Sequence, residues 1–197
     1  STLSSSSAAS DVYKRQVFGM EEMKWSSVQK DMMEYDVTMP YIRMMAGAVD
    51  YTPGAMRNAS KKDFKDIYYN PMSQGTRCHQ LAAYVVHDSP LTMLADNPTI
   101  YKREQECTDF IVSIPNKNIE ETRVLQGKLG ESVVMARRVG ASWYVGGMTD
   151  WTAREITLDF DFLGDGTYEV VLFRDGANAD KPVSYTHLRA HETGAYL

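Results

Sequence analysis

The sequence VDYTPG at residues 49–54 is the stretch from which the fold can be worked out. Its first four residues form a short strand-like run, and the Pro-Gly dipeptide that ends it is a strong turn signal. Farther along, CHQLAAYVVH at residues 78–87 carries apolar side chains at the spacing of a mostly buried helix. Before both, MPYIRMM at residues 39–45 allows a shorter helix with its proline in the first turn. The first half of the chain is therefore predicted to consist of strand–helix units.

From about residue 120 onward, the sequence changes to short β-type runs. Glycine-containing turns separate these runs at regular intervals, a spacing that is typical of an antiparallel sheet or sandwich. The predicted boundary between the two halves lies between residues 111 and 120. We predict five strands, at residues 122–125, 132–137, 142–148, 155–160 and 167–173.

Composition narrows the classes of function. The chain has 197 residues, 43% of them hydrophobic, and a formal net charge of −5. An acidic balance without a Lys/Arg stripe argues against nucleic-acid binding, and no apolar run in the sequence is long enough for a membrane span. Two cysteines exclude a disulfide scaffold and a Cys-rich zinc domain. The sequence also lacks phosphate-binding loops, dinucleotide-binding glycine motifs and the common hydrolase and zinc-protease motifs.

The two ends of the chain do not resemble native protein. SSAASDVYKRQ at residues 6–16 and PVSYTHLRAHET at residues 182–193 are similar to translations of the transposase adapters used in DNA library preparation. Residues 11–16 can be encoded by GAT GTG TAT AAG AGA CAG, whose reverse complement contains codons for Ser-Tyr-Thr-His-Leu, the sequence at residues 184–188. The alternative is a flexible Ser/Ala-rich start and a polar tail. We expect residues 1–16 and 182–197 to be adapter-derived and residues 17–181 to be native.

Several stretches of residues 17–181 occur in a characteristic order. They are VFGMEEMKW (17–25), DYTPGAMRN (50–58), PMSQGTRCHQLA (71–82), SPLTMLADNP (89–98), the segment 130–151 and FRDGANAD (173–180). Together they resemble the C-terminal portion of glycoside hydrolase family 97, a family of α-glucosidases and α-galactosidases found mostly in Bacteroidetes-type bacteria. The DYTPG sequence is the most specific part of this resemblance.

The resemblance implies a fold for each half. Members of the family have an N-terminal β-super-sandwich, a catalytic (β/α)₈ barrel and a C-terminal β-domain. We therefore expect an α/β plus all-β fold. Residues 17–115 would be the C-terminal part of the barrel, containing its last two βα units, and residues 116–181 would be the C-terminal antiparallel β-sandwich. Strands seven and eight of the barrel would lie at residues 17–19 and 49–52, with helices seven and eight at residues 39–45 and 78–87.

The resemblance also implies a catalytic residue and a cofactor. The family's motif resembles EGVxGxE, in which the second Glu is the general acid and also belongs to the calcium shell. Counting through the motif assigns this role to Glu21, while the first Glu would fall at Arg15, inside the expected adapter segment. Cleavage of an α-glycoside needs such a proton donor and a second carboxylate, and Ca²⁺ prefers several oxygen ligands. Glu22 is the alternative to Glu21, since it can equally be a first-turn helix carboxylate.

Three further residues are candidates for substrate binding. Active sites of such barrels lie at the C-terminal ends of the strands, which directs attention to Asp50 and Tyr51 in the DYTPG sequence and to Arg43 before it. Each has an alternative role. Asp50 can organise the turn, Tyr51 can pack in the core, and Arg43 can be a solvated or salt-bridged helix residue.

We therefore predict that the chain is a fragment of a calcium-dependent α-glycosidase, inactive alone, that acts on α-linked glucose or galactose in oligosaccharides. The resemblance further implies a periplasmic or secreted parent. One alternative is a non-enzymatic carbohydrate-binding or structural β-domain, for which buried Trp143 and Trp151 would indicate packing rather than binding. Another alternative is a related glycosidase without the calcium site. Nucleic-acid partners and membrane spans are not expected.

Overall fold

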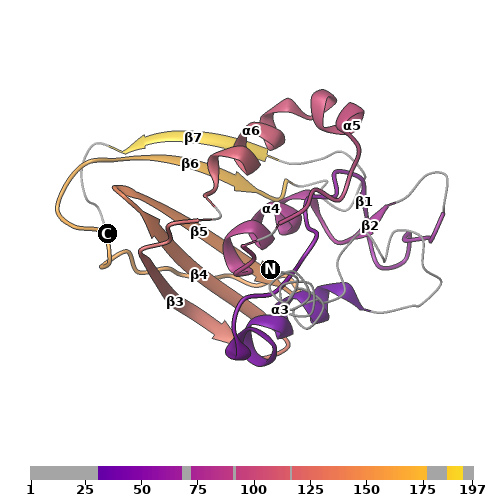
Figure 1. Ribbon diagram of the computed structural model, residues 1–197, viewed down its shortest axis with the longest axis horizontal. Helices are drawn as coiled ribbons and strands as arrows, with labels where there is room; N and C mark the ends of the chain where they lie inside the picture. Colours follow the sequence, from indigo (N-terminus) through magenta and orange to yellow (C-terminus); the bar gives the residue numbers. More distant parts are fainter. Residues whose placement is uncertain (1–30, 68–71, 91, 116, 177–185, 193–197) are drawn as a thin grey trace, which may run out of the picture.

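The computed structural model describes residues 31–67, 72–90, 92–115, 117–176 and 186–192 (Figure 1). Helical elements dominate the first half, and antiparallel strands dominate the second. The helical elements are α3 (Met32–Ile42), the 3₁₀ turn η1 (Met44–Ala46), α4 (Arg77–Val86), α5 (Pro98–Arg103) and α6 (Gln105–Ser113). The strands are β1 (Asn58–Ala59), β2 (Ser73–Gln74), β3 (Glu121–Lys128), β4 (Ser132–Val139), β5 (Ser142–Thr149), β6 (Tyr168–Arg174) and β7 (Thr186–Glu192).

Helix α3 begins earlier than the sequence predicts. Asp31 is its N-cap, and the side chain of Asp31 accepts a hydrogen bond from the backbone N–H of Glu34 at 3.2 Å. Pro40 therefore lies near the end of the helix and not in its first turn, so the predicted start at residue 39 was wrong. Because proline has no N–H, the helix bond from position 40 to the carbonyl of Asp36 cannot form. That carbonyl needs another donor.

Helix α4 confirms the helix predicted at residues 78–87. Thr76 caps its start by accepting a hydrogen bond from the backbone N–H of His79 at 3.2 Å. His87 is the C-cap residue, in an extended conformation. One face of α4 is buried, as the apolar spacing predicts. The buried residues are Arg77, His79, Gln80, Leu81, Ala83, Val85 and Val86.

Strands β3, β4 and β5 form an antiparallel meander in that order, with β4 in the centre. They confirm the strands predicted at residues 122–125, 132–137 and 142–148. Gly130 and Gly140 take positive φ values of 74° and 58° in the two connecting turns. Strand β6 confirms the run at residues 167–173 and pairs antiparallel with β7. Strand β7 lies in the segment that we expect to be adapter-derived.

The strand predicted at residues 155–160 was wrong, since no strand is assigned there. Its alternating pattern is nevertheless visible in the burial of the side chains. Ile156, Leu158 and Phe160 are half-buried, and the residues between them are exposed. A period of two reports which side of an extended chain faces apolar surface, but a strand also requires a partner with which to exchange backbone hydrogen bonds.

The barrel expected in the first half is not confirmed by the described residues. Parallel pairing there amounts to the two-residue strands β1 and β2 and one bridge between Tyr51 and Thr92. The three-stranded sheet is consistent with a C-terminal β-domain, although the described part does not establish a complete sandwich. Helices α5 and α6 were not predicted, although Asn97 followed by Pro98 is a helix start signal. Asn97 accepts a hydrogen bond from Ile100, and Pro98 occupies the first turn.

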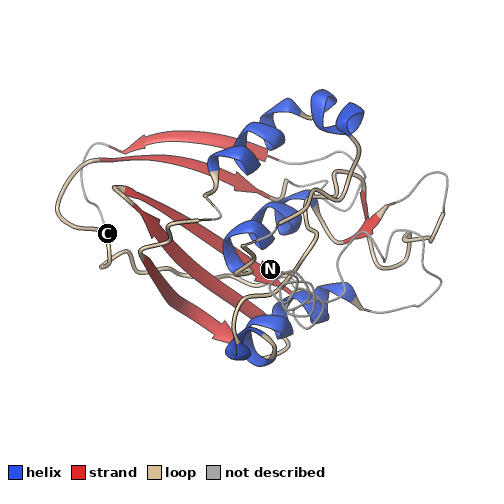
Figure 2. Cartoon of the chain, viewed as in Figure 1, coloured by secondary structure: helices blue, strands red, loops and turns tan. Residues whose placement is uncertain are grey.

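The main hydrophobic core joins the two halves. Helices α3 and α4 lie along one face of the three-stranded sheet (Figure 2). A second cluster lies beneath α5 and α6, where Phe110 and Phe173 are 4.4 Å apart between ring centroids. In the described part of the chain, no helix has the length and apolar character needed to cross a membrane. The residues of the main core are Val37, Met39, Val49, Tyr51, Ala83, Val86, Val133, Met135 and Met148.

Candidate functional site

The predicted site residues occupy different environments. Glu21, the predicted general acid and calcium ligand, lies outside the described residues. Arg43 is the half-buried C-cap of α3, and its Nη1 lies 3.4 Å from the carbonyl oxygen of Gly47. Asp50 is half-buried, whereas Tyr51 is 1% exposed. Asp50 is therefore the more exposed of these two neighbouring residues.

Tyr51 is anchored in the core by two contacts. Its hydroxyl donates a hydrogen bond of 2.6 Å to Oδ1 of Asp36. Its ring also packs at nearly a right angle to the ring of His87, with centroids 4.4 Å apart. This position favours the packing role for Tyr51 over direct contact with a sugar.

The turn that follows Tyr51 is held first by a glutamine side chain of α4. Oε1 of Gln80 accepts hydrogen bonds from the backbone N–H groups of Gly54, at 3.0 Å, and Ala55, at 3.3 Å. Gln80 is completely buried. Buried backbone donors need such partners, so one side chain satisfies both N–H groups of the turn.

Two tyrosines bind the carbonyl groups of the same turn. The hydroxyl of Tyr84 donates to the Pro53 carbonyl at 3.1 Å, and the hydroxyl of Tyr101 donates to the Gly54 carbonyl at 2.8 Å. The backbone N–H of Ala95 also donates to the Pro53 carbonyl, at 3.0 Å. Burial raises the pKa of both tyrosine hydroxyls, so they remain protonated donors.

The last residue of the turn is fixed by charged side chains. The backbone N–H of Met56 donates to Oδ2 of Asp96 at 2.6 Å, and the Met56 carbonyl accepts from Nη2 of Arg77 at 2.7 Å. Arg77 is itself paired with Glu104 at 2.9 Å. The turn from residue 53 to residue 56, three residues after Asp50, is thus hydrogen-bonded on both of its edges.

Gly54 is the residue that this arrangement requires at the tip of the turn. Its φ is +91°, a conformation that residues with a Cβ rarely adopt. A Cβ at this position would also lie 2.4 Å from the Tyr84 hydroxyl oxygen and 3.2 Å from that of Tyr101. The glycine of the DYTPG sequence therefore allows both the backbone turn and the close approach of two tyrosines.

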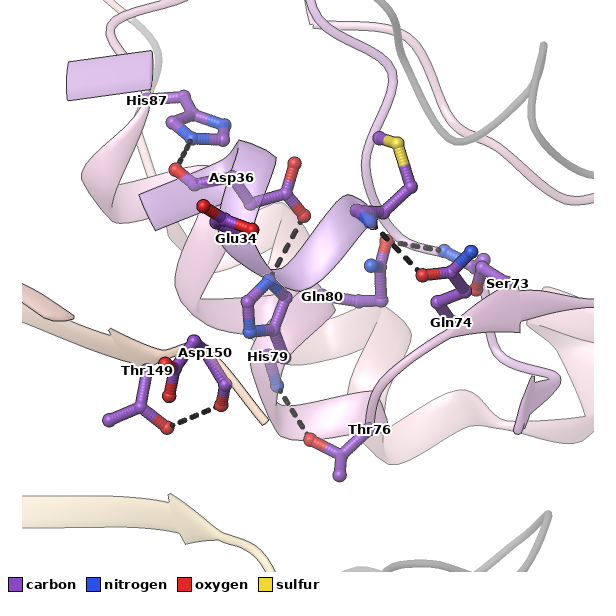
Figure 3. A network of polar contacts seen from close by, with 12 residues as sticks. Glu34, Asp36, Ser73, Gln74, Thr76, His79, Gln80, His87, Thr149 and Asp150 are labelled. Carbon is purple, nitrogen blue, oxygen red and sulfur yellow. Dashed lines mark hydrogen bonds and ion pairs between the residues drawn. The ribbon is translucent and has the colours of Figure 1, made fainter. Parts of the chain in front are cut away.

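A buried polar cluster lies beneath the turn, centred on Asp36 of α3 (Figure 3). Its carboxylate accepts from Tyr51 at Oδ1 and lies 3.0 Å from Nε2 of His79 at Oδ2. Its backbone carbonyl, which Pro40 leaves without a helix donor, lies 3.1 Å from Nε2 of His87. The donor missing from the helix is thus supplied by the C-cap residue of α4.

The protonation of His87 follows from its environment. Burial lowers the pKa of its imidazole, so the ring is neutral around neutral pH. A carbonyl oxygen can only accept a hydrogen bond, so we assign the single ring proton to Nε2, which faces Asp36. The same reasoning assigns the proton of the His79 bond to Nε2, because the carboxylate of Asp36 is an acceptor.

The sequence alone does not reveal this cluster. Asp36 belongs to no motif, and Gln80, His79 and His87 lie within the predicted helix at residues 78–87 without any sign of a shared partner. One signal was present in the sequence, since an Asp four residues before a helical proline leaves its own carbonyl without a donor. The partner that supplies the donor lies about fifty positions away and could not be read from the pattern.

The described residues do not by themselves indicate a metal centre. Among them, no group of three or more His, Cys, Asp or Glu side chains is placed to hold a metal ion. The predicted calcium ligand, Glu21, lies outside this part of the chain. Calcium binding by the parent protein therefore remains a prediction.

The two tryptophans of the β-sheet region are both half-buried and have packing partners. Trp143 packs on Phe162, with centroids 4.7 Å apart, and the guanidinium groups of Arg123 and Arg138 lie about 6 Å from its ring. Nε1 of Trp151 donates a hydrogen bond of 2.8 Å to Asp31. These contacts favour packing over an exposed sugar-binding platform.

Known proteins match this chain over most of its length, including residues outside the described part. Residues 118–194 match the family model described as "Glycosyl-hydrolase 97 C-terminal, oligomerisation". A retaining alpha-galactosidase from Bacteroides thetaiotaomicron is 56% identical over 165 residues, which are 84% of this chain and 25% of the relative. A probable retaining alpha-galactosidase from Streptomyces bingchenggensis is 28% identical over 160 residues, 81% of this chain and 23% of the relative.

Solved structures agree with these sequence relatives. A glycoside hydrolase family 97 enzyme from Pseudoalteromonas sp., solved with panose and also with acarbose, superposes with a TM-score of 0.68 at 31% identity. The match covers 81% of this chain and 25% of that enzyme. A beta-arabinopyranosidase shares the fold, with a TM-score of 0.56 at 21% identity over 81% of this chain and 24% of that protein.

These comparisons all point to one class of protein, the glycoside hydrolases. Within this class, the family that the chain resembles is glycoside hydrolase family 97, which confirms the resemblance predicted from the motifs. The chain spans about a quarter of the length of the relatives it matches. The range of the family model begins at residue 118 and extends into the C-terminal segment that we expect to be adapter-derived.

Proposed function

We propose that the parent of this chain is an exported, calcium-dependent retaining α-galactosidase, to which the chain contributes the general acid. The observation that carries the proposal is the 56% identity with a retaining alpha-galactosidase over 165 residues. The sequence motifs left open both the choice between glucose and galactose and the stereochemical outcome. The names of the two curated relatives favour galactose and retention.

The retaining mechanism would assign one task to this chain, proton transfer to and from the reacting oxygens. In a retaining enzyme, two carboxyl groups about 5 Å apart act on the glycosidic bond, one as the acid and the other as the nucleophile. Glu21 would protonate the leaving oxygen and then, as a carboxylate, accept a proton from the attacking water. The nucleophile would come from the part of the parent upstream of residue 17. Residues 17–181 alone are therefore expected to be inactive.

Calcium and substrate binding complete the proposal. When bound, Ca²⁺ would supply positive charge next to the acid and polarise the substrate. Asp50 is the described residue that we consider best suited to reach a sugar hydroxyl, because it is half-buried and lies three residues before the hydrogen-bonded turn. Arg43 remains a second candidate, and Tyr51 would act on the substrate only through its neighbour.

The general acid can be tested in the full-length parent protein. Glu21→Gln should lower kcat by several orders of magnitude for alkyl or disaccharide α-galactosides and much less for aryl galactosides whose leaving groups need no proton. Glu22→Gln is the matched control, because it removes the neighbouring carboxylate. An equal loss with both kinds of leaving group would refute the acid role of Glu21.

Substrate class, cofactor and export require separate measurements. The parent should hydrolyse p-nitrophenyl α-galactoside faster than the corresponding glucoside, with the anomeric configuration retained in the first product observed by NMR.

Dialysis against a calcium chelator should abolish turnover, and added Ca²⁺ should restore it. Fractionation of cells should place the parent outside the cytoplasm. Inverted product would contradict the retaining assignment.

A further inference from the structure

Asp36 connects the elements that surround the turn after Asp50. Its two carboxylate oxygens and its backbone carbonyl each contact a different side chain. Figure 3 shows two of these contacts, to His79 and His87. Tyr51 comes from the segment that contains Asp50, and the two histidines come from the two ends of α4. A single helix residue therefore links the turn to α4.

The carboxylate of Asp36 has the partners that its burial requires. The residue is 0% exposed, and a buried carboxylate without hydrogen-bond donors would be strongly unfavourable. The donors are the Tyr51 hydroxyl at 2.6 Å and His79 Nε2 at 3.0 Å. Asp36 therefore restricts the position of the Tyr51 hydroxyl in addition to the packing of the Tyr51 ring on His87.

The backbone carbonyl of Asp36 fixes the position of α4 relative to α3. Because Pro40 cannot donate to it, the imidazole of His87 occupies the free acceptor site. The ring of His87 also packs against Tyr51. Gln80, on the same helix as His87, binds the backbone of the turn. Any shift of Asp36 would therefore reach the turn along two routes, through Tyr51 and through α4.

Asp50 lies in the segment that these routes reach. It precedes the anchored Tyr51, and the turn after it is bonded at both edges by α4 and α5 side chains. The half-buried Asp50 is thus carried on a backbone whose position depends on side chains that are mostly buried, among them Asp36 and Gln80. Catalytic and binding groups need this kind of support, because an error of about 1 Å in placement can reduce a rate about a hundredfold.

We propose that Asp36 is a positioning residue for the hydrolytic reaction: it sets the position of Asp50 through Tyr51 and α4, and it does not contact the substrate. This inference rests on the proposed α-galactosidase function of the parent. It assigns a role to a buried residue that the general acid, the calcium site and the substrate contacts leave unexplained.

The test uses the full-length parent with an aryl α-galactoside. Asp36→Asn keeps the shape of the side chain but removes its charge, and Tyr51→Phe removes only the hydroxyl. We expect both variants to fold, to raise KM at least threefold and to lower kcat/KM at least tenfold. The double variant should be no worse than the more impaired single variant, because both changes break the same connection. Asp63→Asn is the matched control, since Asp63 is exposed and its carboxylate accepts a hydrogen bond from the hydroxyl of the nearby Ser60.

Three results would overturn the inference. The first is a KM within twofold of wild type in both folded variants, since a merely smaller folded fraction would lower kcat and leave KM unchanged. The second is a double variant whose losses multiply. The third is a Tyr51→Phe variant with normal kinetics where Asp36→Asn fails to fold. A wild-type parent that cleaves no α-galactoside would instead refute the proposed function, so the two failures can be distinguished.

Discussion

Replacement of Gly54 by alanine tests whether the turn after Asp50 is as tightly constrained as its contacts indicate. The backbone at Gly54 has a φ of +91°, which a residue with a Cβ adopts at a cost of about 1–2 kcal/mol. The new Cβ would also meet the Tyr84 hydroxyl oxygen at 2.4 Å. Displacing that hydroxyl breaks its bond to the Pro53 carbonyl and leaves a buried donor unsatisfied, a loss of about 1–3 kcal/mol. The expected total is about 2–5 kcal/mol.

Gly47→Ala is the matched control for this prediction. Gly47 also has a positive φ, of +116°, but a Cβ there would have no heavy atom within 4 Å. It should show the backbone contribution alone, about 1–2 kcal/mol. Urea denaturation followed by circular dichroism measures both variants. With a slope of about 1–3 kcal/mol per molar urea, the difference between them is a clear shift in the midpoint.

A double variant separates the steric contribution from the backbone contribution. In a Tyr84→Phe background the closest contact is absent, so Gly54→Ala should destabilise the chain by about 1 kcal/mol less than it does in the wild type. If Gly54→Ala is no more destabilising than Gly47→Ala, or if its effect is the same in both backgrounds, the close approach of Tyr84 does not constrain the turn. Either outcome would refute the reasoning.

Three further predictions concern the packing of α4. Gly146→Ala should destabilise the chain by about 1–3 kcal/mol in urea, because its Cβ would lie 2.8 Å from a side-chain carbon of Val85 in α4. Gly147→Ala is the control and should have little effect, because the nearest atom to its Cβ would be 3.5 Å away. Arg137→Met should destabilise by about 2–4 kcal/mol, because the buried guanidinium donates to the last two carbonyls of α4. Arg138→Met is the comparison: Arg138 is half-buried and pairs with the solvent-accessible Glu120, so the loss should be smaller, at most about 1 kcal/mol. Burial lowers the pKa of His87 in the folded state, so its contribution to stability should be complete above pH of about 6.5 and decline as the pH falls toward that lowered value. Denaturation at pH 7.5 and pH 5 should show this loss, His87→Gln should reduce it, and an identical pH dependence in that variant would contradict the assignment.

Local sequence patterns predicted the elements whose signals are local. Helix α4 has both a buried apolar face and a Thr76 cap, and β3 to β5 are bounded by glycine turns. The pattern at residues 155–160 failed because alternation indicates one-sided burial and does not identify a strand partner. The barrel strand expected at residues 49–52 amounts to a single bridge for the related reason that its neighbours must come from elsewhere in the sequence.

The candidate site likewise has one part that the sequence reveals and another that it does not. Asp50 could be singled out because the DYTPG sequence resembles a family motif, and the alternative that it organises a turn was visible from the Pro-Gly dipeptide. The groups that hold this turn come from α3, α4 and α5, at positions up to about fifty residues away. A single sequence contains no record of such contacts. Asp36 looked like an ordinary helix residue until its burial and its three partners were known.

The core that the two halves share should determine how the chain unfolds. Side chains of α3 and α4 and of strands β4 and β5 belong to one hydrophobic cluster, and Arg137 of β4 binds the end of α4. Because the two halves share a core and a buried charged contact, we expect them to unfold as a single cooperative unit. Slowly exchanging amide hydrogens should therefore occur in α4 and β4 alike, with similar protection. A protease that cuts the connection between α6 and β3 should leave the two pieces associated.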